Sequence, residues 1–143
     1  MGYRYIEDIV TADVAFEARA NTLKGVFVSA AEALLNTMVI NIDSVSNQTS
    51  KNISVESDSK EMLLFDFLQE LIFFKDSEQL LLRLKKMDIL ESGTKCSANF
   101  RLCGERINPE KHDLAVDVKA ITMHLFGLTQ KVNEWVATVV LDV

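Results

Sequence analysis

The stretch DVAFEARANTLKGVFVSAAEALLNTM, residues 13–38, contains two different hydrophobic periods. In its first part apolar and charged residues alternate, with Val14 and Phe16 on the same side, which is typical of a half-buried strand. After Asn21 the apolar residues recur every three or four positions, which is typical of an amphipathic helix. Asn21 lies at the change of period and is the predicted N-cap. The stretch therefore predicts a strand followed directly by a helix.

The remaining elements follow on both sides of this stretch. A second helix is predicted to begin near Asp58, with Glu61 three residues later in capping-box spacing. It is apolar over more than one face, so we expect it to be the more buried helix. The predicted strands are residues 3–7, 13–19, 51–57, 79–87, 94–104, 117–125 and 134–142. Two helices among many strands predict an α+β fold in two layers, with a mixed, mostly antiparallel sheet and two main helices packed on it.

Length and composition are those of a globular protein with one domain, residues 1–143. The apolar fraction of 48% and the charged fraction of 25% are ordinary for such a protein. The net charge is −6. Because phosphate contacts need clustered lysine and arginine, this acidic balance argues against strong direct binding of nucleic acid.

The sequence contains no signal for export or for a membrane. The N-terminal residues lack the apolar run of a signal peptide. No stretch reaches the roughly 18 apolar residues that a membrane-spanning helix needs. We therefore expect a cytoplasmic protein without membrane association.

Motifs of independent catalysis are missing from the sequence. It has no glycine-rich phosphate loop, no nucleophile elbow and no His-Glu-x-x-His zinc helix. Together these absences argue against an enzyme that acts alone.

Carboxylates near the two ends of the chain could form an oxygen-lined cation site. Asp13 opens a predicted strand among apolar neighbours, and Asp142 ends another beside the carboxylate of Val143. Calcium and magnesium prefer oxygen ligands of this kind. The alternative is that Asp13 caps a turn and that Asp142 simply meets solvent. Spacing alone leaves both readings open.

The two histidines are too few for a zinc site built from nitrogen and sulfur donors. His112 lies in a polar loop, and His124 lies in a predicted strand that also contains Lys119. Both fit structural or surface positions.

Four segments together resemble the archease family, and the resemblance covers essentially the whole chain. The most specific of these segments is the block around Lys119. The segments are TADV at residues 11–14, GE at 104–105 followed by KH at 111–112, LDV at 141–143, and DVKAITMH at 117–124.

The resemblance implies a function and a ligand set. Archeases assist the guanylate-dependent RNA-splicing ligase of the RtcB type: they promote ligase guanylation and multiple turnover in tRNA splicing and RNA repair. The family carries a divalent cation, seen as calcium, and the corresponding ligands here are Asp13, Asp142 and Val143. Magnesium is the alternative cation. Lys119, His112 and His124 are then candidates for contact with the ligase partner.

Two positions differ from the usual pattern of the family. Val10 stands where the family has histidine, and Ala15 stands where it has glycine. Groups that surround metal ligands tune the affinity of the site, so these differences bear on cation binding. Two other functions stay open: a small metal-dependent hydrolase, and a metal-free chaperone or scaffold protein.

Overall fold

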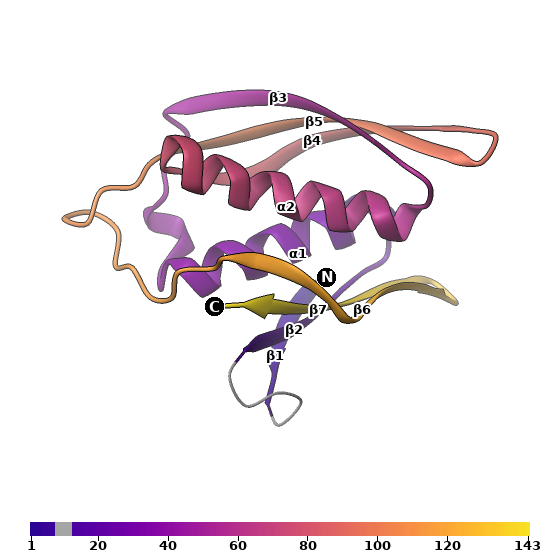
Figure 1. Cartoon of the computed structure of the whole chain (residues 1–143), viewed down its shortest axis with the longest axis horizontal. Helices are drawn as coiled ribbons and strands as arrows, with labels where there is room; N and C mark the ends of the chain where they lie inside the picture. The colour runs from indigo at the N-terminus through magenta and orange to yellow at the C-terminus, as the bar shows by residue number, and fades with distance from the viewer. Residues whose placement is uncertain (8–12) are drawn as a thin grey trace.

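The computed structural model describes residues 1–7 and 13–143, which form two helices between two antiparallel sheets (Figure 1). The elements in chain order are β1 (Gly2–Ile6), β2 (Val14–Ala20), α1 (Leu23–Met38), the 3₁₀ turn η1 (Ile42–Ser44), β3 (Thr49–Ser57), α2 (Lys60–Glu78), β4 (Leu80–Ser92), β5 (Lys95–Arg106), β6 (Ala120–Lys131) and β7 (Glu134–Asp142).

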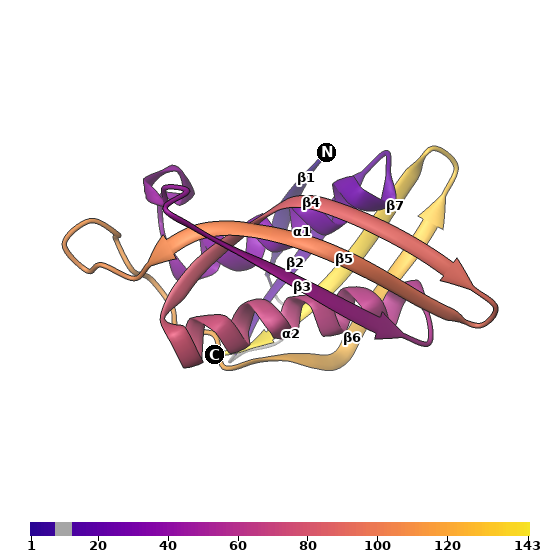
Figure 2. The same cartoon turned by 90° about the horizontal axis from the view of Figure 1, so that it is seen from above.

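The strands are divided between the two sides of the helices. One sheet has the order β1-β2-β7-β6 and the other the order β3-β5-β4. Seen from above, the strands of the two sheets run across one another (Figure 2). The predicted α+β class and its two packed helices are confirmed, and every pairing in these sheets is antiparallel. The strands form two sheets where the sequence indicated one, because an alternating pattern shows which face is buried but not the layer that covers it.

Both helices begin one residue later than predicted. The Thr22 hydroxyl accepts a hydrogen bond from a first-turn backbone N–H, so Thr22 caps α1 in place of Asn21. The Ser59 hydroxyl does the same for α2, in place of Asp58. Asparagine, threonine, aspartate and serine are all good N-caps. Residue type therefore does not decide which of two adjacent residues caps the helix; the backbone conformation before the helix does.

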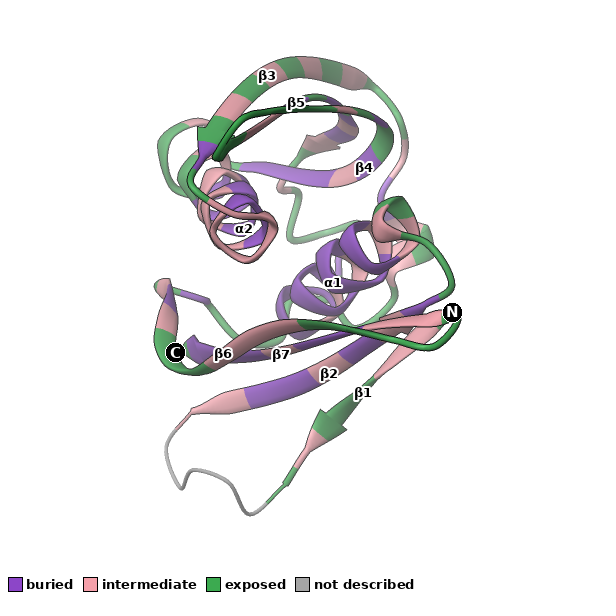
Figure 3. Ribbon diagram, turned by 90° about the vertical axis from the view of Figure 1, so that its right-hand side faces the viewer, coloured by how far each residue is buried: buried purple, intermediate pink, exposed green. Residues whose placement is uncertain are grey.

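The helix that is more buried is α1, which corrects the prediction that it would be α2. Ten of the 16 residues of α1 are buried, against seven of the 19 residues of α2. In the β1-β2-β7-β6 sheet, α1 packs on the central strands β2 and β7, whereas α2 packs on the edge strand β6 (Figure 3).

Three phenylalanines join the helices to the β3-β5-β4 sheet at the centre of the core. The Phe67 ring of α2 lies 4.5 Å from Phe100 of β5 and 5.6 Å from Phe27 of α1, between ring centroids. All three side chains are fully buried. Within residues 1–7 and 13–143, neither helix combines the length and hydropathy needed to cross a membrane.

Candidate functional site

The β2–β7 ladder brings the predicted carboxylates toward one another. Val14 pairs with Leu141, the last pair in that ladder. Asp13 immediately precedes this pair and Asp142 immediately follows it, so the two occupy opposite positions when the register is continued by one step. Opposite residues of antiparallel strands direct their side chains to the same face of a sheet. Asp13 is half-buried and Asp142 is exposed.

The backbone of Asp142 is held by strand β6 on its other side. Ala120 pairs with Asp142, and the Lys119 N–H donates to the Asp142 carbonyl oxygen at 2.8 Å. The carboxylate of Asp142 is therefore free of the ladder and lies at the sheet end. Val143 follows directly, is half-buried and packs against the hydrophobic core. The Lys119 side chain is exposed at the same end of the sheet.

The donors at this sheet end are oxygens only, which fits a hard cation such as calcium or magnesium. Asp13 and Asp142 supply carboxylates, and Val143 supplies further oxygens. In the part of the chain that the structure describes, no group of three or more His, Cys, Asp or Glu side chains is placed to hold a metal. The candidate set contains two such side chains, so Val143 is needed to complete it.

Of the two positions that differ from the family pattern, the structure describes only Ala15. Val10, together with Thr11 and Ala12 of the early motif, lies outside the described residues. Ala15 is buried and pairs with Ile6 on one side and Val140 on the other. Since Ala15 takes part in regular pairing on both sides, the strand accommodates alanine there without the conformational freedom of glycine.

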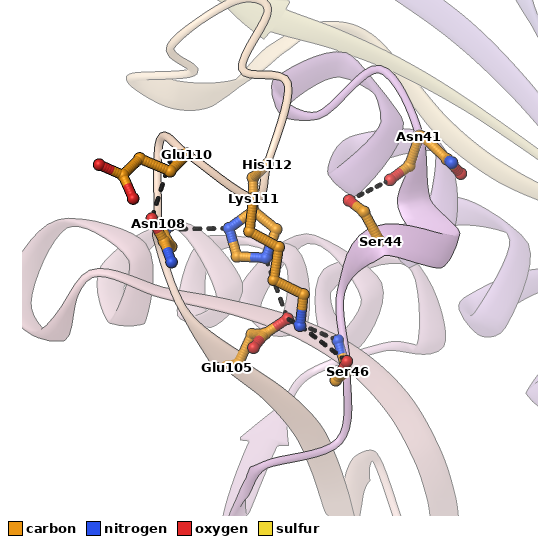
Figure 4. Close-up of polar contacts among 8 residues, drawn as sticks. All are labelled: Asn41, Ser44, Ser46, Glu105, Asn108, Glu110, Lys111 and His112. Carbon is orange, nitrogen blue, oxygen red and sulfur yellow. Dashed lines mark hydrogen bonds and ion pairs between the residues drawn. The ribbon is translucent and has the colours of Figure 1, made fainter.

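A second polar cluster surrounds Glu105 at the end of β5 (Figure 4). Its Oε2 accepts hydrogen bonds from Lys111 Nζ and Ser46 N, each at 2.7 Å, and lies 3.0 Å from His112 Nε2. The Lys111 ammonium, then the Ser46 N–H and His112, lower the pKa of Glu105 from 4.5 to about 2. The cluster ties the loop after β5 to the segment before β3.

The His112 side chain is an internal part of this cluster. Its Nδ1 accepts the N–H of Asn108 at 2.9 Å, which assigns the proton of a neutral ring to Nε2, the atom facing Glu105. The side chain has 0% exposure. A partner that docks on this structure cannot reach the imidazole, which corrects the expectation that His112 makes a partner contact.

By contrast, His124 on β6 and Lys119 directly before this strand are exposed. His124 lies in a bulge, where the ladder to β7 shifts between Thr122 and Gly127. Its neighbours Met123 and Leu125 are large apolar residues that are also exposed. Both predicted residues are therefore accessible to a partner.

Sequence reasoning missed Lys75, in the last turn of α2. Its side chain is only 6% exposed, and its ammonium contacts Asp76, Asp117 and the carbonyl of Val118. The available signal was its spacing: Lys75 continues the buried positions Leu68 and Ile72 of α2. A lysine on such a face needs acceptors for its charge.

Residues 3–143 match the model of the archease protein family (MTH1598/TM1083). The chain belongs to the archease family. The archease of Methanosarcina acetivorans is 34% identical over 142 residues, which are 99% of this chain and 95% of that relative. The archease of Archaeoglobus fulgidus is 30% identical over 143 residues, and both proteins are covered in full. The resemblance seen in the sequence motifs is thereby confirmed.

Two solved structures share the archease fold seen here. The solution structure of Methanobacterium thermoautotrophicum protein 1598 superposes with a TM-score of 0.85 at 30% identity, covering 99% of each chain. The crystal structure of a Thermotoga maritima protein, described as an archease and possible chaperone, has a TM-score of 0.61 at 20% identity. That match covers 98% of this chain and 99% of the other, and at this identity it concerns the fold alone.

Proposed function

We propose that this archease activates a guanylate-dependent RNA-splicing ligase of the RtcB type. It promotes ligase guanylation and multiple turnover in tRNA splicing and RNA repair, in the cytoplasm, as an accessory protein rather than an enzyme. The observation that carries the proposal is membership of the family over residues 3–143. The position of Asp13 next to the last β2–β7 pair, with Asp142 on the opposite strand, supports it.

The proposed ligands of a divalent cation are Asp13, Asp142 and Val143, and calcium is preferred to magnesium. Bound there, the cation offsets the negative charge of the two carboxylates at the end of the sheet. Asp13 is half-buried and Asp142 is exposed, so solvent reaches both proposed carboxylate ligands. Asp142 ends β7 and Asp13 directly precedes β2, so the paired strands bring the two residues to the same end of the sheet.

The proposed partner contact is made by the exposed side chains near this end of the sheet. Lys119 precedes β6 directly, and His124 lies in the bulge of the same strand. The net charge of −6 suits a basic partner such as an RNA-binding ligase, because opposite charges speed encounter. The same charge disfavours direct contact with RNA, so the protein acts on the ligase.

The test is multiple-turnover joining of tRNA halves by the ligase of the same organism. We expect this protein to accelerate joining and the Asp13→Ala variant to give no acceleration while remaining folded. Asp88→Ala is the matched control, because Asp88 is an exposed carboxylate of β4, in the other sheet. Full activation by a folded Asp13→Ala protein would contradict the assignment of the site.

Chelation and calorimetry separate the parts of the proposal. Acceleration that chelator treatment reduces supports both the function and the cation, whereas acceleration indifferent to chelation leaves only the function. Calcium and magnesium that release no heat and shift no melting temperature favour a metal-free chaperone or scaffold protein. Turnover of a phosphoester by this protein alone favours a metal-dependent hydrolase.

A further inference from the structure

Lys75 is the side chain by which helix α2 reaches the segment in front of β6. Its Nζ donates to Asp117 Oδ1 at 2.6 Å and to the Val118 carbonyl at 2.7 Å. A third acceptor, Asp76 Oδ1, lies 2.6 Å away. An ammonium group has three donors, so these three acceptors satisfy it completely.

The charge of Lys75 is more than balanced by its neighbours. Burial alone would lower its pKa, but hydrogen bonds to Asp117 and Asp76 outweigh burial and raise the pKa above the ordinary value. One ammonium between two carboxylates leaves the cluster with a net charge of −1. Such a cluster does not repel a cation bound nearby, as an unpaired lysine would.

A continuous chain of contacts leads from Lys75 to the proposed cation ligand Asp142. Val118, which Lys75 binds, is followed by Lys119, and the Lys119 N–H donates to the Asp142 carbonyl at 2.8 Å. The next residue, Ala120, pairs with Asp142 in the ladder. The end of β7 is therefore held by a segment that α2 itself holds.

This tether is separate from the contacts that fix the rest of the loop. Residues 107–119 connect β5 to β6 without a strand or helix of their own. Their middle part is bound to the end of α1, where Ala115 N donates to the Met38 carbonyl and Ile40 N to the Asp113 carbonyl. Lys75 is thus the side chain that extends this anchoring to the last residues before β6.

We infer that Lys75 is a positioning residue that holds Asp142 opposite Asp13 through the segment 117–119. This inference rests on the proposed function, since it assigns Lys75 to the cation site proposed there. Residues that orient metal ligands from behind typically change metal affinity about 10- to 100-fold when they are replaced.

The experiment measures calcium affinity by titration calorimetry in the unsubstituted protein and in Lys75→Met. Methionine fills the space of the lysine stem, and the exposed Asp76 and Asp117 carboxylates remain solvated, so we expect the variant to fold. Lys51→Met is the matched control, because Lys51 pairs with Glu78 at the same end of α2 but makes no contact with the segment 117–119. Hydrogen exchange of the Lys119 amide in the cation-free protein gives a second measurement.

We expect Lys75→Met to bind calcium about 10- to 100-fold more weakly and to exchange the Lys119 amide faster, with Lys51→Met unchanged in both. Asp117→Asn, which keeps Lys75 and changes only an exposed acceptor, should give a smaller loss in the same direction. The inference alone would be overturned if the unsubstituted protein binds calcium and the folded Lys75→Met and Asp117→Asn variants bind it with the same affinity. Absence of calcium binding by the unsubstituted protein would overturn the proposed cation site and the role of Lys75 with it.

Discussion

Glu105 shows how one carboxylate can couple the stability of this protein to pH. Three donors, from Lys111, Ser46 and His112, surround its Oε2. They favour the ionised form, so the pKa of Glu105 falls to about 2 in the folded protein. Between the folded pKa of about 2 and the ordinary value of 4.5, the unfolded chain therefore binds more protons than the native protein. The contribution of Glu105 is fully present above about pH 4.5 and is lost as the pH falls toward 2.

The first prediction concerns Glu105→Gln. Urea unfolding of the unsubstituted protein should show a free energy of unfolding that falls between pH 4.5 and the lowest accessible pH. The variant should be less stable at neutral pH by about 1–3 kcal/mol, because a buried network loses its charged acceptor. It should also lose less stability across the acid range. Glu110→Gln, an exposed residue of the same loop, is the control. Parallel pH profiles for the unsubstituted protein and Glu105→Gln would contradict the prediction.

Residue types predicted the donors of the candidate site but not the surroundings of each one. Asp13 and Asp142 stand out in sequence because both are charged residues beside apolar strands. His112 became a candidate only through the resemblance, and it is buried against Glu105. The difference depends on Asn108, whose N–H satisfies the second ring nitrogen through a tight loop turn. Such a partner is set by backbone conformation, which residue types alone leave undetermined.

At the scale of the strands, Gly104 of β5 leaves no space for a side chain next to β4. A Cβ added at this glycine would lie 1.8 Å from the carbonyl oxygen of Leu81, which belongs to the neighbouring strand. No rotation of a side chain relieves this contact, since the opposing atom is backbone. The glycine therefore permits the pairing of Gly104 with Leu82 and the placement of Glu105 just beyond it.

Gly104→Ala should consequently destabilise the protein by about 1–3 kcal/mol or more, the usual cost of an inserted methyl group that forces backbone shifts. The free energy of unfolding in urea measures the effect. Gly127→Ala, in β6, is the matched control, because its added Cβ would meet no atom nearer than 3.8 Å. Equal stability of the two variants would show that the β4–β5 approach is adjustable.

Element boundaries were predictable where the hydrophobic period changes and less so where strands deform. The change of period near Asn21 located α1 to within two residues. The strand predicted for residues 117–125 is instead β6, Ala120–Lys131. Between Thr122 and Gly127 this strand advances five residues while its partner advances two, from Val140 to Thr138. The extra residues of the bulge interrupt the alternation that defines a strand in sequence.

At the scale of the whole molecule, the class of fold was predictable and the number of sheets was not. The apolar faces of the strands and the stripes of the helices show that they must cover one another. They do not show that α1 is covered on both sides, by β2 and by β4. The decisive contacts join residues far apart in sequence, such as Phe27 and Phe100.

The contacts among Phe27, Phe67 and Phe100 join the two helices to the β3-β5-β4 sheet. Phe67 lies in the middle layer and packs on Phe27 and Phe100, so its removal weakens both helices and the β3-β5-β4 sheet together. Trp135, the only tryptophan in the sequence, lies on β7 in the opposite sheet. Its fluorescence therefore reports on that sheet and on the contact of its ring with Lys60, the first residue of α2.

Phe67→Ala should lower the free energy of unfolding by about 3–5 kcal/mol, the usual cost of deleting a buried phenylalanine ring. If the layers unfold as one unit, Trp135 fluorescence and far-ultraviolet circular dichroism will show the same urea midpoint in the variant, shifted by the same amount. The matched control is Phe73→Ala on the same helix, because Phe73 is 58% exposed and its loss should change stability little. A Trp135 transition that stays in place while the circular dichroism transition shifts would mean that the β1-β2-β7-β6 sheet, which carries Asp142, unfolds independently.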